Sequence, residues 1–195
     1  MRKSIAIPII LVLSAIIATF AGYIGDMVTK SINPIKYSEF VTKYSAQYNV
    51  PEPIVYAVIK TESSFRPDAK SSKGAIGLMQ ITPVTFEWLC AKTGEEPNPS
   101  LLYDPETNIR YGTYYLSLLY SEFQVWDTVY AAYNAGRGRV NEWLSTPEYN
   151  NRGRLKNIPF KETAKYVEKV VKKAQIYEEM YFSDAKTITE SVVNE

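Results

Sequence analysis

Histidine is absent from this sequence of 195 residues, and its absence removes more candidate chemistry than any other count. Without an imidazole, serine or cysteine triads with a histidine base, histidine-bearing zinc sites and two-histidine iron centres are excluded. The single cysteine, Cys90, cannot form an intrachain disulfide or a CxxC redox motif. Carboxylates, amides and hydroxyls therefore remain as the groups that could carry a reaction.

The sequence also lacks an excess of charge. It has 22 Lys and Arg residues against 21 Asp and Glu residues, a formal net charge of +1. Because such a chain has no cationic field to attract a polyanion, nucleic-acid binding is not expected. Apolar types make up 46% and charged types 22%, as in globular domains rather than disordered or multi-pass membrane proteins. At this length we expect one hydrophobic core.

One long uncharged segment lies at the N-terminus, where residues 5–24 follow Arg2 and Lys3. As a helix it would reach about 30 Å, the thickness of a hydrocarbon core. This length favours a retained anchor over a signal peptide, whose apolar core is typically about 7 to 15 residues; cleavage before Gly22 is the alternative. The leading basic residues favour a cytoplasmic N-terminus. We therefore predict an anchor or signal segment at residues 1–30, with the rest outside the cytoplasm, held at the cell membrane or secreted after cleavage.

Helix signals fill the remaining chain, and no strong alternating strand pattern is present. Cap-then-proline pairs at Thr82-Pro83 and Asp104-Pro105 predict two helix starts, and Gly94 predicts the end of the first of these helices. The run 63–73 is polar and is predicted to be a loop. We expect helices at about 38–48, 51–62, 83–93, 105–123, 127–134, 140–144 and 160–182. The predicted fold class is all-α, with one compact domain at residues 31–182 and a polar C-terminal tail at 183–195.

Glu62 stands out at the end of one predicted helix. It falls about 20° from Val55 around the helix, which places a carboxylate on the apolar stripe. Burial and the negative end of the helix dipole both disfavour the ionised form, so a raised pKa is expected, as a general acid requires. The alternative is a structural role, in which Glu62 caps the helix or pairs with Lys60 or Arg66.

Three further segments contain polar residues that suit a binding groove. The glycine-containing run 74–83 permits a close backbone approach and carries the amide of Gln80. Tyr133 and Asn134 lie among small residues at a predicted helix end, and Glu162 lies in the first turn of the last helix. Each segment has a structural alternative. The run 74–83 could be a loop whose apolar residues are buried, and Tyr133 and Asn134 could simply mark the end of a helix. Glu162 could be an acidic residue that interacts favourably with the helix dipole.

Taken together, four segments resemble the lytic transglycosylases with an SLT domain, whose fold is similar to goose-type lysozyme. The resemblance covers about residues 37–181. The four segments occur in order and at suitable separations, which makes the set specific although each is weak alone. They are Glu62-Ser63-Ser64-Phe65, Gly74 through Pro83, Ala132 through Gly136, and Glu162-Thr163 with Tyr166-Val167.

The resemblance implies a role for each matched residue. Glu62 corresponds to the catalytic acid/base, and Ser71 to a hydroxyl that contacts the reacting sugar or its carboxylate partner. The residues that correspond to subsite positions are Gln80, Tyr133 and Asn134, and Glu162 corresponds to a second acidic residue in the cleft. Thr82 stands where some relatives carry an apolar residue, so a hydrophobic sugar contact is not assigned there.

The implied substrate is the glycan strand of peptidoglycan, cut between N-acetylmuramic acid and N-acetylglucosamine with formation of a 1,6-anhydro ring. One carboxylate suffices because the sugar supplies its own attacking hydroxyl, and no metal or cofactor is expected. Other expected partners are the membrane, through the N-terminal helix, and an unidentified wall-synthesis or secretion-apparatus protein. The alternative functions are a hydrolytic muramidase, with Asp68 or Glu162 positioning water, and a non-catalytic peptidoglycan-binding scaffold.

Overall fold

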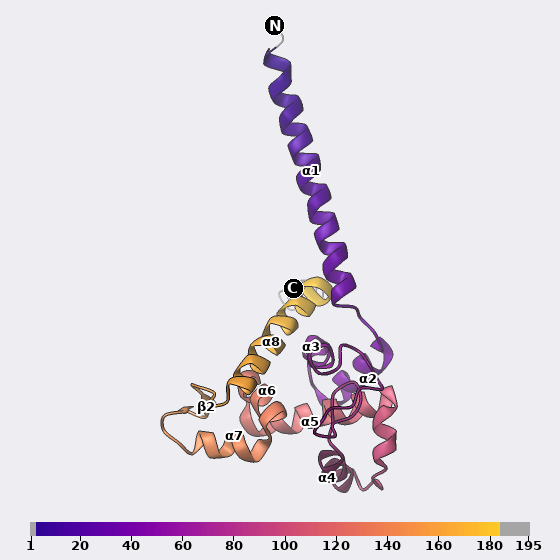
Figure 1. The fold of residues 1–195 in the computed structure, drawn as a ribbon, viewed down its shortest axis with the longest axis vertical. Helices are drawn as coiled ribbons and strands as arrows, with labels where there is room; N and C mark the ends of the chain where they lie inside the picture. Colours follow the sequence, from indigo (N-terminus) through magenta and orange to yellow (C-terminus); the bar gives the residue numbers. More distant parts are fainter. Residues whose placement is uncertain (1–2, 184–195) are drawn as a thin grey trace, which may run out of the picture. The chain divides into compact units, whose positions relative to one another are not determined.

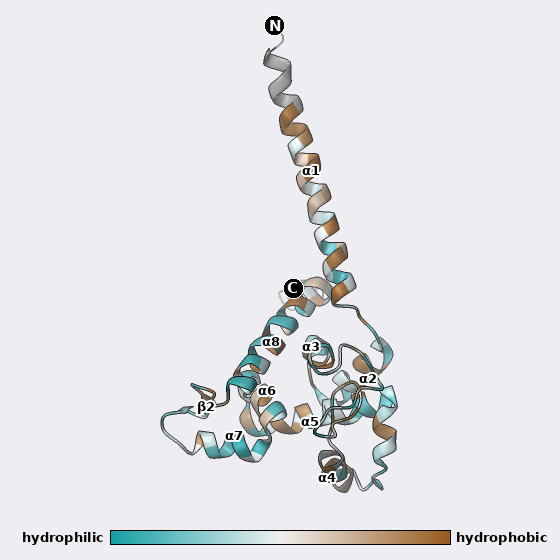
Figure 2. Cartoon of the chain, viewed as in Figure 1, coloured by the Kyte–Doolittle hydropathy of each residue, from teal (hydrophilic) through white to brown (hydrophobic). Residues whose placement is uncertain are grey.

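The computed structural model describes residues 3–183. The chain divides into two units, and the boundary in the sequence lies between Ile35 and Lys36. The N-terminal unit is one helix, α1 (Lys3–Ile32), and apolar residues predominate in the part of it that Figure 2 colours by hydropathy (Figures 1 and 2). Within it, Ile10–Ile32 has a mean hydropathy of 1.8 and is long enough to cross a membrane. The predicted apolar N-terminal helix is confirmed, and its composition suits an anchor and a signal sequence alike.

The second unit is mostly helical, which confirms the predicted fold class. Besides seven α-helices, its described part contains a 3₁₀ turn, a π-helical turn and a small antiparallel hairpin that the sequence patterns did not indicate. Of the predicted polar tail, residues 184–195 lie outside the described residues. The elements are α2 (Ser38–Tyr48), α3 (Glu52–Glu62), α4 (Pro83–Thr93), η1 (Pro99–Tyr103), α5 (Pro105–Phe123), α6 (Trp126–Ala135), α7 (Arg137–Leu144), β1 (Asn150–Asn151), β2 (Arg154–Leu155), α8 (Lys161–Tyr177) and η2 (Glu178–Phe182).

Local capping chemistry fixes two helix starts where the sequence predicts them. The Thr82 hydroxyl accepts a hydrogen bond from the Thr85 amide at 3.2 Å, and Asp104 accepts one from the Thr107 amide at 2.8 Å. Each cap satisfies an amide that the first turn leaves without a helical partner. Gly94 ends α4 with φ 75°, a left-handed conformation that glycine adopts without steric penalty.

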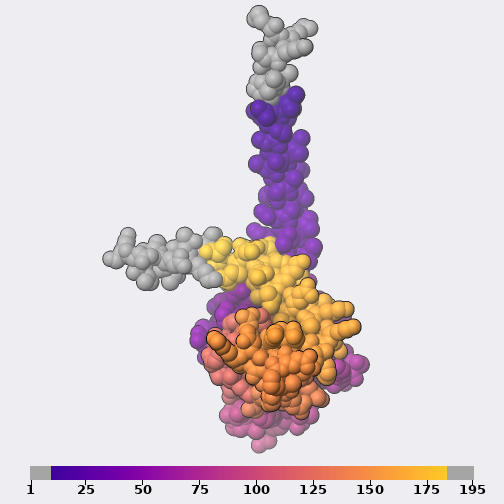
Figure 3. All heavy atoms as spheres, turned by 90° about the vertical axis from the view of Figure 1, so that its left-hand side faces the viewer, coloured from indigo at the N-terminus to yellow at the C-terminus, as the bar shows by residue number. Residues whose placement is uncertain are grey.

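Helix α3 runs through the core, and residues 53–59 are all buried. It packs along α8, where the fully buried Tyr56 stacks on Tyr177 with ring centroids 5.4 Å apart. Helix α6 also packs against α8 (Figure 1). Residues of α7, the hairpin and α8 form much of the face seen in Figure 3. Because α3 is covered on all sides, its last residue, Glu62, emerges directly from the core.

Candidate active site

Glu62 is the last residue of α3, and its side chain is partly buried. The Tyr166 hydroxyl, from α8, donates a hydrogen bond of 2.6 Å to Glu62 Oε1. Burial raises the pKa of Glu62 from 4.5 to about 7, and the hydrogen bond from Tyr166 opposes that rise by favouring the ionised form. The carboxyl group is therefore poised to give and to take a proton near neutral pH.

The geometry does not show the structural alternative for Glu62, in which it caps its helix or pairs with Lys60 or Arg66. Among the described residues, neither Lys60 nor Arg66 forms an ion pair with it. Arg66 instead donates from Nε to the Ser63 carbonyl at 3.1 Å. The hydrogen-bonding partner of the Glu62 carboxyl group comes from another helix, 104 residues along the chain.

The backbone after Glu62 turns sharply. Ser64 and Phe65 both have positive φ values, 53° and 64°, which are strained for residues with a side chain. The buried Ser63 hydroxyl donates to the Leu78 carbonyl at 2.8 Å, and Phe65 is 4% exposed. These contacts hold the turn against the core and tie the end of α3 to the glycine-containing loop.

That loop is held in place by the buried Asn108 of α5. Its Nδ2 donates to the carbonyls of Ile76 (2.9 Å) and Leu102 (2.7 Å), and its Oδ1 accepts from the Met79 amide at 2.7 Å. Gly77, with φ 80°, allows the close approach, because a Cβ there would lie 2.2 Å from both the Leu102 oxygen and Asn108 Nδ2. The predicted need for a tight backbone approach in this run thus has a physical basis.

Three of the predicted binding residues come together. Gln80, Tyr133 and Asn134 line one hollow of about 240 Å³ between the loop, α5 and the end of α6. The Tyr133 hydroxyl donates to the Met79 carbonyl at 2.8 Å, and Asn134 Oδ1 accepts from the Thr163 hydroxyl at 2.9 Å. These contacts fix both side chains in position.

The Gln80 amide nitrogen is used within the loop, where it donates to Ala69 O at 3.2 Å and Gly77 O at 2.9 Å. Glu62 does not line this hollow, but its carboxyl group is close enough to affect the pKa of Tyr133 and of Tyr166. Burial, followed by the Glu62 charge, raises the pKa of Tyr133 and of Tyr166 well above the ordinary value. Both phenols therefore stay neutral and act as hydrogen-bond donors.

The other two predicted residues, Ser71 and Glu162, do not line the hollow. Ser71 Oγ accepts from the Ala75 amide at 3.0 Å and so organises its own turn. The Glu162 side chain is 79% exposed and lies 4.0 Å from Lys73 Nζ, an exposed pair that contributes little to stability. Lys73 belongs to the same turn as Ser71, so the pair shows that this turn lies near the first turn of α8.

Sequence reasoning assigned no role to Tyr166 or Asn108. Tyr166 lies in the fourth motif, one helical turn after Glu162. This spacing is the only feature of the sequence that indicates its position near the site. Asn108 is 1% exposed, and nothing near it in the sequence indicates that two of its partners, Ile76 and Met79, lie in a loop about thirty residues earlier. Among the described residues, no group of three or more Cys, Asp or Glu is arranged to hold a metal ion.

Comparison with known proteins agrees with this arrangement. The family model described as the transglycosylase SLT domain matches residues 39–154. The match covers more than half of the chain, and the chain belongs to this family. The resemblance read from the four motifs is thereby confirmed.

The individual proteins to which the chain is similar are also lytic transglycosylases by name. Over 166 residues the chain is 37% identical to a "Soluble lytic murein transglycosylase" of Escherichia coli (strain K12), covering 79% of this chain and 24% of that protein. It is 41% identical over 118 residues to a "Membrane-bound lytic murein transglycosylase C" of Yersinia pestis (strain Pestoides F), covering 54% of this chain and 32% of that one.

Among solved structures, the fold is similar to that of the 70 kDa soluble lytic transglycosylase Slt70 from Escherichia coli, with a TM-score of 0.73 and 34% identity. The match covers 85% of this chain and 27% of that one. The chain therefore spans about a quarter of the length of the E. coli relatives it matches.

Proposed function

We propose that this chain is a lytic transglycosylase that cleaves the glycan strands of peptidoglycan between N-acetylmuramic acid and N-acetylglucosamine. Its family and the printed names of its relatives support this activity. The observation that carries the proposal is Glu62, a carboxyl group at the end of a buried helix with its pKa raised to about 7 and a phenol donating to it.

In the proposed reaction, protonated Glu62 gives its proton to the glycosidic oxygen as the bond from C1 to that oxygen breaks. The resulting carboxylate takes the proton of the muramyl 6-hydroxyl as that oxygen bonds to C1, which closes the 1,6-anhydro ring. The proton count on Glu62 is restored, and no water is consumed. Holding the 6-hydroxyl and C1 within one sugar provides the proximity that a second catalytic group would otherwise supply.

The neighbouring side chains have supporting roles in this proposal. Tyr166 orients the Glu62 carboxyl group and stabilises its ionised form after the first proton transfer. Gln80, Tyr133 and Asn134 line the adjoining hollow and offer hydrogen bonds and an aromatic face to a sugar. Ser71 and Glu162 do not line this hollow, and they would contact only a part of the substrate that extends beyond it.

The hydrolytic alternative needs a carboxylate to position water opposite Glu62. Glu162 is exposed beside Lys73, and Asp68 is exposed on the loop. In the described part of the chain, no second carboxylate contributes to the pKa of Glu62. This environment suits a single acid/base better than a carboxylate pair.

Product analysis on purified sacculi tests the proposal. We expect the wild-type chain to release fragments with anhydro ends, and Glu62→Gln to lose activity by about 10²- to 10⁴-fold. Glu168→Gln is the matched control, because Glu168 is exposed on α8 and lies about 200° around the helix from Tyr166. Reducing ends would indicate hydrolysis. Equal activity of Glu62→Gln would refute the role of Glu62 as the acid/base, and the absence of released fragments from the wild type as well would leave a binding scaffold.

We also propose that the helical unit works outside the cytoplasm, either held at the membrane by α1 or released after signal cleavage. The apolar span Ile10–Ile32 supports export in both cases. The mass of the mature protein distinguishes them: an intact N-terminus indicates an anchor, whereas a chain beginning at Gly22 indicates cleavage.

A further inference from the structure

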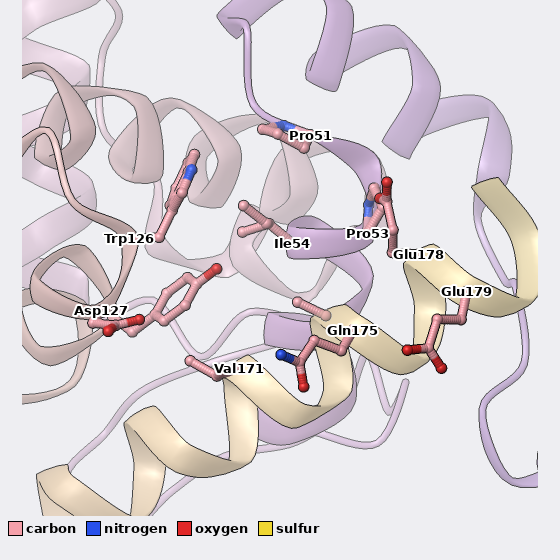
Figure 4. A pocket seen from close by; sticks show the side chains of 11 residues that line it. Pro51, Pro53, Ile54, Trp126, Asp127, Val171, Gln175, Glu178 and Glu179 are labelled. Carbon is pink, nitrogen blue, oxygen red and sulfur yellow. The ribbon is translucent and has the colours of Figure 1, made fainter. Parts of the chain in front are cut away.

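The helices that carry the candidate active site enclose a second groove at their opposite ends. Glu62 and Asn134 lie at the C-terminal ends of α3 and α6, and Tyr166 lies in the N-terminal part of α8. The first residues of α3 and α6 and the last turns of α8 instead line a hollow of about 480 Å³ (Figure 4). Ile54, which lines this groove, lies eight residues before Glu62, about 12 Å away along α3.

The hollow has an apolar floor, and stacked aromatic rings lie at its side. Ile54, Val171 and Trp126 come from three different helices and face the same space (Figure 4). Trp126 stacks with both Tyr120 and Tyr130, with ring centroids 4.4 and 5.9 Å away. Such a row offers flat apolar surface together with the negative ring faces that attract cations.

A second hollow of about 450 Å³ shares the lining residues Pro51 and Trp126 with the first, and we call the two hollows together the groove. Ser45 lines this second part and is 6% exposed. Its Oγ has no hydrogen-bond partner among the described residues. A buried hydroxyl without a partner is costly, and a ligand with hydrogen-bonding groups would satisfy it.

The charge of the groove is of one sign. Among the described residues that line it, none is Lys or Arg, whereas the acidic ones are Glu52, Asp127, Glu178 and Glu179. Asp127 already pairs with Arg154 at 2.7 Å, on the outer side of the groove. Glu52 and Glu179 keep the lining acidic, and they would repel the carboxylates of peptidoglycan stem peptides.

We propose that this groove binds an extended segment of a partner protein that carries Lys or Arg side chains. Carboxylates and aromatic faces together hold cationic side chains, by charge-assisted hydrogen bonds and cation–π contacts. An extended segment also presents backbone groups to Ser45 and apolar atoms to the floor. This binding goes beyond the proposed cleavage reaction and is independent of Glu62.

The test uses the full chain in phosphatidylcholine nanodiscs, with empty nanodiscs as the blank. The probe is a fluorescein-labelled ten-residue peptide of alternating Lys and Pro, and its neutral counterpart has Gln in place of Lys. Fluorescence anisotropy measures the affinity. We expect the Lys peptide to bind at least about 10-fold tighter than the Gln peptide, with affinity that falls as salt rises.

Variants on the protein side complete the test. The double variant Glu52→Gln/Glu179→Gln should weaken binding of the Lys peptide about 10-fold, whereas Glu168→Gln, which changes an exposed carboxylate outside the groove, should not. Trp126→Ala should weaken it and Trp126→Phe should largely restore it. Glu62→Gln should bind as the wild type does, so a failed cleavage proposal leaves this result unaffected.

Two outcomes overturn the inference. One is equal affinity for the Lys and Gln peptides, a comparison that needs only the wild-type chain and so does not depend on the folding of any variant. The other is displacement of the Lys peptide by soluble peptidoglycan fragments that bind more tightly, which would make the groove a second glycan site.

Discussion

The raised pKa of Glu62 predicts that the free energy of unfolding depends on pH, and that Glu62→Gln removes this dependence. In the folded chain the pKa is about 7, against an ordinary value of 4.5. The folded state therefore binds more protons than the unfolded state between these values, and stability must fall as pH rises through this window. A difference of this size corresponds to about 3 kcal/mol at pH 8 and above, and to nothing below about pH 4.

The assay is urea unfolding of the full chain in mild detergent, followed by tryptophan fluorescence at pH 5 and pH 8.5. All 3 tryptophans lie in the second unit, so the signal reports on the domain that contains Glu62. We expect the stability of Glu62→Gln relative to wild type to increase by about 2 to 3 kcal/mol between the two pH values. Glu168→Gln should show no such change. A relative stability of Glu62→Gln that is the same at both values would refute the reasoning, since it would mean that the carboxyl group is not desolvated.

Three further predictions concern the surroundings of Glu62. Tyr166→Phe removes the donor that favours the ionised form of Glu62, so the alkaline limb of the pH–activity profile should move to higher pH in a sacculus-clearing assay. Asn108→Ala leaves the buried Met79 amide without its partner and should lower the free energy of unfolding by about 2 to 4 kcal/mol, measured with urea. Gly77→Ala combines backbone strain with a steric clash, and we expect a loss of more than about 2 kcal/mol in the same measurement.

Matched controls separate these effects from general damage. Tyr103→Phe removes an exposed phenol and should leave the alkaline limb in place. Asn141→Ala, at an exposed position on α7, should cost less than about 1 kcal/mol. Gly138→Ala has open space for its Cβ within α7 and should be neutral or stabilising. If Tyr166→Phe leaves the alkaline limb unmoved, the role given to its hydrogen bond with Glu62 is wrong. If the control variants are as destabilised as Asn108→Ala and Gly77→Ala, the roles given to Asn108 and Gly77 are wrong.

Helix positions were predictable because their signals are local. The pairs Thr82-Pro83 and Asp104-Pro105 act on the amides of the next turn, and the structure contains the side-chain caps that they predict. The hairpin at 150–155 was not predictable in the same way, because each of its strands has two residues, too few for an alternating pattern. The burial of α3 on all sides likewise depends on neighbours such as α8, which no local pattern specifies.

The sequence by itself determined the chemical repertoire and the candidate acid: without histidine, and with Glu62 closing an apolar helix, a carboxyl group with a raised pKa was the available choice. Only the tertiary structure decided which group would face that carboxyl, because Tyr166 reaches it from 104 residues away. The same holds for the grouping of Gln80, Tyr133 and Asn134, and for the placement of Glu162 outside their hollow, beside Lys73. Propensity and capping act within a few residues, whereas burial and hydrogen bonding between helices depend on how the helices pack.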